Sequence, residues 1–185
     1  SILSEEFLME LKGMEHKNIA LEVLRKLLED EIKARSKFNL VEGRTLMEVL
    51  DNSIRRYHNK IITAVEVIDD LIELSKIMVG KDNEAESMGL TTYEYAFYSA
   101  VADNESAREL MGKDKLRELA VVLTETIRKN ASIDWTIKEN VRSKMKVAVR
   151  RLLRKYGYPP DMRLLATETV IKQAERIAEE ITNGM

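Results

Sequence analysis

Apolar residues recur every three or four positions along most of the chain, which is the spacing of one face of an α-helix. No segment alternates apolar and polar residues as a half-buried strand does. The pattern predicts an all-α fold, an irregular multi-helix bundle of roughly seven or eight helices around one long helix. The longer predicted helices cover about 18–35, 45–78, 113–129, 136–156 and 161–182, and shorter ones follow Ser4 and Thr91 and cover about 105–111.

The longest predicted helix begins at Thr45, which forms a capping-box pattern with Glu48, and continues to Met78. Gly80 stands where a helix-terminating glycine is expected. At 1.5 Å per residue this helix is about 51 Å long, so we interpret it as a spine, continuous or only kinked. The polar stretch 81–90 is predicted to be a mobile loop. It marks a weak division within a single helical domain that covers residues 1–185.

Two further capping-box patterns, Thr91 with Glu94 and Thr136 with Glu139, predict helix starts. The aromatic residues within 93–98 are interpreted either as core packing or as an exposed patch for a partner helix.

The composition narrows the class of protein. Seven glycines and two prolines in 185 residues argue against a turn-rich β-fold. The absence of cysteine excludes disulfides and thiolate metal sites, and it fits a reducing, cytoplasmic location. The apolar runs are too short for a membrane-spanning helix, so no membrane partner is expected. Because the chain begins with Ser1 rather than Met, we expect a piece of a larger protein.

Patterns that carry catalytic chemistry are missing from the sequence. The glycines are scattered singly, so neither of the common phosphate-binding loops is present. His16 and His58 do not stand in the spacings typical of metal ligands. Glu31 and Lys33 match half of a nuclease motif but lie inside a predicted helix, and the acidic residues within 69–73 are interpreted as a solvated face. We therefore expect no catalytic, cofactor-binding or metal-binding residue in this chain.

One charge pattern is unusual. Segment 138–155 carries eight basic residues and one acidic residue, although the whole chain has a net charge of −2. We name as the basic ridge the five residues spaced four apart, which are Lys138, Arg142, Lys146, Arg150 and Arg154. Three more basic residues add to the charge, and these are Lys144, Arg151 and Lys155. The ridge is a candidate contact for DNA phosphates or for an acidic protein face, and a plain solvated face is the remaining alternative.

Several segments resemble the motor (R) subunits of type I restriction enzymes, in the same order and over most of the chain. They are HKNIAL at 16–21, LLEDEIKAR at 27–35, IDWT at 133–136 and RRLLRKYGYPPD at 150–161. The YGYPPD turn is the most distinctive of them.

The resemblance implies that this chain is the helical region at the carboxyl end of such a subunit. A nuclease domain and two helicase-type motor domains would then precede it, and ATP and magnesium would be bound there rather than here. The helical region would dock the motor onto the methyltransferase and specificity subunits and help to hold double-stranded DNA. The resulting hypothesis is a non-catalytic assembly module, and the alternative is an autonomous helical domain that binds the DNA backbone through the basic ridge.

Overall fold

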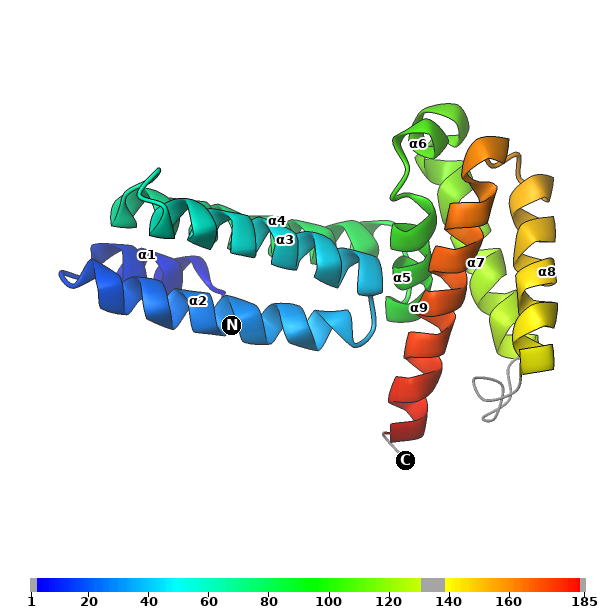
Figure 1. Ribbon diagram of the computed structural model, residues 1–185, viewed down its shortest axis with the longest axis horizontal. Helices are drawn as coiled ribbons and strands as arrows, with labels where there is room; N and C mark the ends of the chain where they lie inside the picture. Colours follow the sequence, from blue (N-terminus) through cyan, green and yellow to red (C-terminus); the bar gives the residue numbers. More distant parts are fainter. Residues whose placement is uncertain (1–2, 131–138, 184–185) are drawn as a thin grey trace. The chain divides into compact units, whose positions relative to one another are not determined.

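The computed structural model describes residues 3–130 and 139–183 (Figure 1). The described residues form α-helices and one short 3₁₀ helix and contain no strand, which confirms the predicted all-α multi-helix fold. The elements are α1 (Glu5–Gly13), α2 (Lys17–Ser36), α3 (Leu40–His58), α4 (Ala64–Ser87), α5 (Thr92–Val101), α6 (Glu105–Met111), α7 (Lys113–Asn130), α8 (Glu139–Lys155), η1 (Pro160–Met162) and α9 (Arg163–Asn183). None of these helices is long and apolar enough to cross a membrane.

The chain is divided into two compact units. The first comprises Ser1–Ser36 and Gly43–Glu84, and the second comprises Lys37–Glu42 and Ala85–Met185. Each unit has its own buried apolar cluster. Helices α3 and α4 contribute residues to both units.

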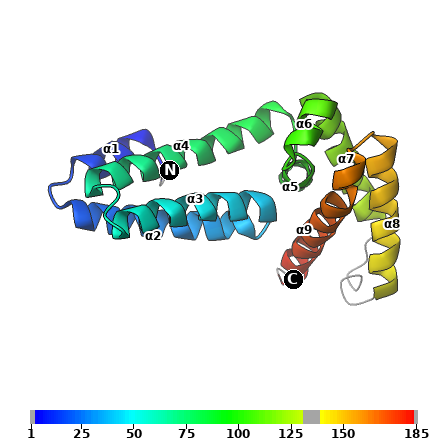
Figure 2. The same cartoon turned by 45° about the horizontal axis from the view of Figure 1, so that its top comes forward.

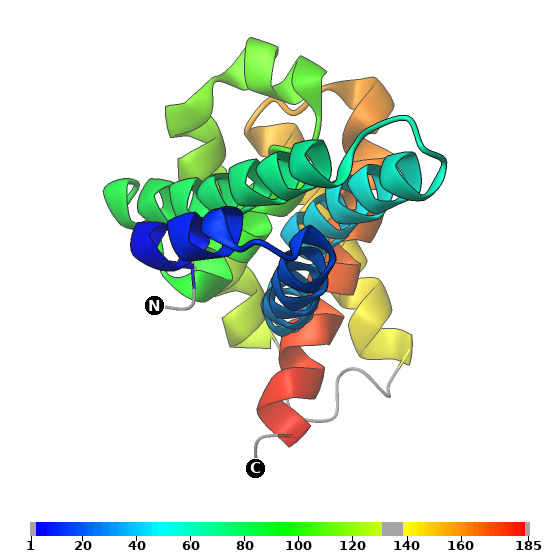
Figure 3. The same cartoon turned by 90° about the vertical axis from the view of Figure 1, so that its left-hand side faces the viewer.

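In the first unit the helices lie side by side (Figures 1 and 2). The Tyr57 hydroxyl donates to Asn18 Oδ1 at 3.3 Å, which places the end of α3 beside the start of α2. Arg35 Nη2 lies 2.7 Å from Asp82 Oδ2, which places the end of α2 beside the last turns of α4. Helix α2 is therefore antiparallel to α3 and parallel to α4, and Figure 3 views the unit from the side of α1.

The predicted continuous helix from Thr45 to Met78 is wrong, because the chain reverses direction between α3 and α4. Lys60 adopts a left-handed conformation with φ of 58°. The N–H of Lys60 donates to the Tyr57 carbonyl at 3.0 Å, and the N–H of Ile61 donates to the Arg56 carbonyl at 2.9 Å. This pair of bonds is the Schellman arrangement that ends a helix. Within the described residues, the predicted long helix is thus replaced by two shorter helices, α3 and α4.

Helix α4 begins with a capping box. Thr63 Oγ1 accepts the Glu66 N–H at 3.2 Å, and Glu66 Oε1 accepts the Thr63 N–H at 3.2 Å. Ile62 and Val67 are both buried in the first core, in the positions of a hydrophobic staple. Ile61, which kept the apolar spacing unbroken in the sequence, is 64% exposed. The apolar periodicity therefore gave no indication of this turn, whereas the capping residues Thr63 and Glu66 mark the start of the next helix.

The predicted helix start at Thr45, helix end at Gly80 and loop at 81–90 also differ from the structure. Thr45 lies inside α3, which begins five residues earlier at Leu40, and Gly80 lies inside α4. The predicted mobile loop at 81–90 is wrong, because α4 continues to Ser87. The residue that adopts a left-handed conformation after α4 is Gly89, with φ of 66°.

In the second unit, α5, α7, α8 and α9 form a closed ring of neighbours, in which each helix packs against the next, and α6 packs on α7. The capping box of Thr91 and Glu94 is confirmed. Tyr95, Phe97 and Tyr98 are buried, so the aromatic segment is part of the core rather than an exposed patch. The predicted capping box that involves Thr136 lies outside the described residues.

The connector between α2 and α3 is fastened to the second unit by side-chain amides. Gln173, which is fully buried, accepts the Leu40 N–H with Oε1 and donates Nε2 to the Phe38 carbonyl, both at 2.8 Å. Asn39 donates to Ser99 Oγ at 2.9 Å. The connector residues 37–42 are thereby held as part of the second unit.

Candidate functional site

Helix α8 presents the main charge feature of the described residues. Its buried side chains are Met145, Val149 and Leu153, which belong to the second core. The spacing of four residues between them defines the side of α8 that packs on α7 and α9. The prediction of a helix with one apolar side and one cationic side is therefore confirmed.

The first half of the basic ridge is paired within the unit. Arg142 Nε lies 3.0 Å from Glu175 Oε1, and Lys146 Nζ lies 3.1 Å from Glu168 Oε1. Both acids are on α9, and all four side chains are between a quarter and two-fifths exposed, at 39/27% and 32/34%. These residues therefore join α8 to α9. Lys138 lies outside the described residues.

The second half of the ridge is free. Arg150 and Arg154 are exposed, and their side chains form no ion pair or hydrogen bond with the side chains described within 3–130 and 139–179. The difference between the halves follows from helix geometry. Each four-residue step turns about 40° around a helix of 3.6 residues per turn, so the ridge passes from the packed edge into solvent.

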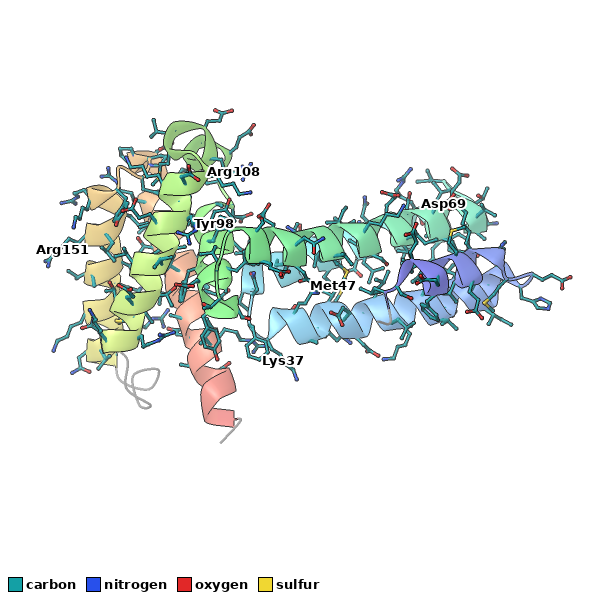
Figure 4. The ribbon with its side chains drawn as sticks, turned by 180° about the vertical axis from the view of Figure 1, so that it is seen from behind. Lys37, Met47, Asp69, Tyr98, Arg108 and Arg151 are labelled. Carbon is teal, nitrogen blue, oxygen red and sulfur yellow. The ribbon has the colours of Figure 1, made fainter. Side chains whose placement is uncertain are left out.

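The exposed basic residues of α8 form a set that only partly overlaps the predicted ridge. We call it the outer face, and its members are Lys144, Arg150, Arg151, Arg154 and Lys155. At about 100° per residue they fall within an arc of about 140°. Val147, which is 53% exposed, lies within this arc. Figure 4 shows Arg151 pointing away from the helix.

Lys144, Arg151 and Lys155 do not follow the four-residue spacing that defines the basic ridge, although they lie on the exposed side of α8. Their angular distance from the centre of the apolar arc is the sequence signal that places them on the outer face. A fixed four-residue spacing follows one ridge of the helix surface instead, and that ridge does not stay on one face.

A buried tyrosine fixes the chain between α8 and α9. Tyr158 donates its hydroxyl to the Val101 carbonyl at 2.7 Å, and Arg163 Nε donates to the Tyr158 carbonyl at 2.9 Å. Burial, with a smaller contribution from Asp103, raises the pKa of Tyr158 to about 12. The hydroxyl therefore stays protonated and keeps its hydrogen bond at neutral pH. Gly157, with φ of 77°, makes the preceding reversal possible.

Acidic residues lie near one end of α8. Burial raises the pKa of Tyr156, and the charges of Glu118 and Glu125 on α7 add to the effect. Tyr156 packs against the second core, on the side of α8 opposite the outer face. Between Lys144 and Lys155 the chain contains no acidic residue.

The acidic residues among the other sequence candidates form ion pairs with neighbouring basic side chains. Their ion pairs are Glu31 with Arg35 at 3.2 Å, Asp69 with Lys12 at 3.1 Å and Asp70 with Arg56 at 3.9 Å. His16 and His58 are exposed. Within the described residues no three His, Asp or Glu side chains are placed to hold a metal ion.

Comparisons with known proteins identify the family of the chain. A sequence profile described as "Type I restriction enzyme HindI endonuclease subunit-like, C-terminal" matches residues 1–180. The chain belongs to this family. It is 42% identical over 182 residues to the type I restriction enzyme HindI endonuclease subunit of Haemophilus influenzae. It is also 32% identical over 160 residues to a protein of Methanocaldococcus jannaschii proposed to be the type I restriction enzyme MjaIXP endonuclease subunit.

These alignments cover 98% and 85% of the chain but only 17% and 15% of the two relatives. The chain therefore spans a small part of the curated relatives that it matches. No solved structure shows significant similarity to the chain.

Proposed function

We propose that the chain is a non-catalytic assembly module of a type I restriction enzyme. It docks an ATP-dependent DNA translocase and endonuclease subunit onto the methyltransferase core. The observation that carries this proposal is the match of residues 1–180 to the C-terminal family of such subunits. The chain spans only 17% of its relative from Haemophilus influenzae, and in this proposal the sites for ATP, magnesium and DNA cleavage lie in other parts of the subunit.

The second unit offers an apolar surface for such docking. Leu164 and Leu165 are adjacent at the start of α9, and each is 61% exposed. Apolar side chains of this kind form the centre of protein interfaces. Docking through them is less sensitive to salt than binding through exposed charges, because ions screen charge–charge attraction within about 10 Å at 0.1 M salt.

Capture of the purified chain by an immobilised complex of methyltransferase and specificity subunits tests the proposal. We expect capture that persists at high salt and weakens when Leu164 and Leu165 are both replaced by serine. Leu110→Ser is the matched control, because Leu110 is 66% exposed on α6. Failure of the parent chain to be captured would contradict docking. ATP turnover or DNA cleavage by the chain alone would contradict a non-catalytic role.

A further inference from the structure

The outer face of α8 has no partner in the second unit, and the docking proposal does not use it. It places five cationic side chains on one exposed arc, and none of them forms an ion pair within the described residues. We infer that the outer face binds the sugar–phosphate backbone of double-stranded DNA. This inference rests on the geometry of α8 and stands independently of docking through α9.

The dimensions of the outer face suit a duplex. Lys144 and Lys155 are separated by about 16 Å along the helix axis, at 1.5 Å per residue. A duplex of that length carries roughly ten phosphates, since there is one negative charge per about 1.7 Å of axis. Arg150, Arg151 and Arg154 lie between the two lysines at the carboxyl half of the face. Several of the five cations can therefore reach phosphates of one duplex together.

The paired half of the ridge offsets two acidic residues of α9 that lie beside α8. Glu168 and Glu175 of α9 would repel phosphates if they were uncompensated, but Lys146 and Arg142 neutralise them at 3.1 and 3.0 Å. The acids of α7 that influence Tyr156 lie towards the packed side of α8. The local charge at the outer face is therefore positive, although the chain as a whole carries −2.

The composition of the outer face favours DNA over an acidic protein. Protein interfaces usually have an apolar or aromatic centre with charges at the rim. Here the five cations surround Val147 alone. Between 144 and 155 there is also no Asn, Gln, Asp or Glu, the residue types that read adenine and cytosine edges, although arginine and lysine can contact guanine as well as phosphate. We expect the five cations to contact phosphates, which carry no sequence information, so that binding does not depend on DNA sequence.

Binding of the purified chain to a labelled random-sequence duplex of about 20 base pairs, measured from about 50 to 200 mM salt, tests the inference. The variant is Arg150→Gln with Arg154→Gln. Each phosphate contact contributes about 0.9 to the slope of log affinity against log salt, so the double variant should lower that slope by roughly 1.8. Affinity for AT-rich and GC-rich duplexes should be equal.

The matched control is Lys33→Gln with Arg55→Gln, which removes the same charge from exposed positions on α2 and α3. It should leave the salt slope unchanged, and both double variants should keep the thermal midpoint of the parent. An equal loss of slope in both variants would overturn the inference, because net charge alone would then explain binding. Absence of DNA binding at low salt, with loss of capture by the methyltransferase complex in the α8 variant alone, would also overturn it in favour of an acidic protein face. Capture of the parent chain reports separately on docking.

Discussion

At Gly43 the first unit has no room for a side chain. A Cβ atom built there would lie 2.0 Å from Ser36 Oγ, 2.7 Å from Ser36 Cβ and 2.9 Å from Ser36 Cα. Rotation of the serine side chain could move the hydroxyl but neither carbon. The close approach therefore depends on glycine, and it lies where α2 ends and α3 begins.

We expect Gly43→Ala to lower the free energy of unfolding by about 1–3 kcal/mol, because the methyl group must displace backbone. Gly80→Ala is the matched control. Gly80 lies inside α4 with nothing within 4 Å of its Cβ position, so alanine should stabilise the helix by about 0.5–1 kcal/mol. Urea unfolding of both variants measures the difference. Equal effects at the two positions would contradict the close approach at Ser36.

Residue roles on α8 were predictable in part. Sequence alone located the basic segment and its apolar side correctly, since both follow from helical periodicity. It could not show that Arg142 and Lys146 meet Glu175 and Glu168, because those acids lie more than twenty residues away on α9. The basic ridge therefore combined residues that join helices with residues that face solvent.

At the scale of elements, the capping residues proved more informative than apolar spacing. The box of Thr91 and Glu94 was predicted and is present. The box of Thr63 and Glu66 was overlooked, because apolar residues continue at helical intervals through the turn. Periodicity reports which residues are apolar, whereas a capping box reports where backbone N–H groups need a partner. Apolar residues can therefore continue at helical intervals through a turn between two helices, while a capping box still shows where the second helix begins.

The two descriptions of segment 59–66 predict opposite results for Ala64→Pro. In a continuous helix proline would cost about 3 kcal/mol or more. In the structure Ala64 is the first residue of α4, where proline is favoured. We therefore expect the thermal midpoint of Ala64→Pro to stay close to that of the parent, while Glu73→Pro, in the middle of α4, lowers it strongly. Comparable destabilisation by both prolines would support the continuous helix over 45–78 and contradict the turn between α3 and α4.

At the scale of the whole molecule, no pattern in the sequence indicates that residues 37–42 pack with the second unit. The segment is short and largely polar at its start, and its partner Gln173 follows Leu40 by 133 residues. A buried glutamine on an otherwise apolar helix face is a weak sequence signal, because its partners are backbone groups that any sequence supplies. Only the tertiary structure shows that its two amide atoms satisfy a donor and an acceptor of the same connector.

Replacing Gln173 with Glu should make this connection dependent on pH. A charged carboxylate can accept the Leu40 N–H but cannot donate to the Phe38 carbonyl, and it would be fully buried. We expect the free energy of unfolding at neutral pH to fall by at least about 2 kcal/mol. Burial raises the pKa of the new carboxyl in the folded chain above the value of about 4.3 that it has when unfolded.

The protonated acid has an O–H donor and a carbonyl acceptor in place of the amide NH2 and oxygen, so it can restore both hydrogen bonds. Its stabilising contribution should therefore be present below the unfolded-state pKa and be lost as the pH rises through the higher folded-state pKa. The control is Gln173→Leu, which lacks both bonds at every pH. Urea unfolding of the parent and both variants at about pH 4 and pH 7 separates the cases, because the deficit of Gln173→Glu relative to the parent should shrink at low pH while that of Gln173→Leu stays constant. A deficit of Gln173→Glu that is the same at both pH values would mean that the amide does not bridge Phe38 and Leu40, and that the connector is held by packing alone.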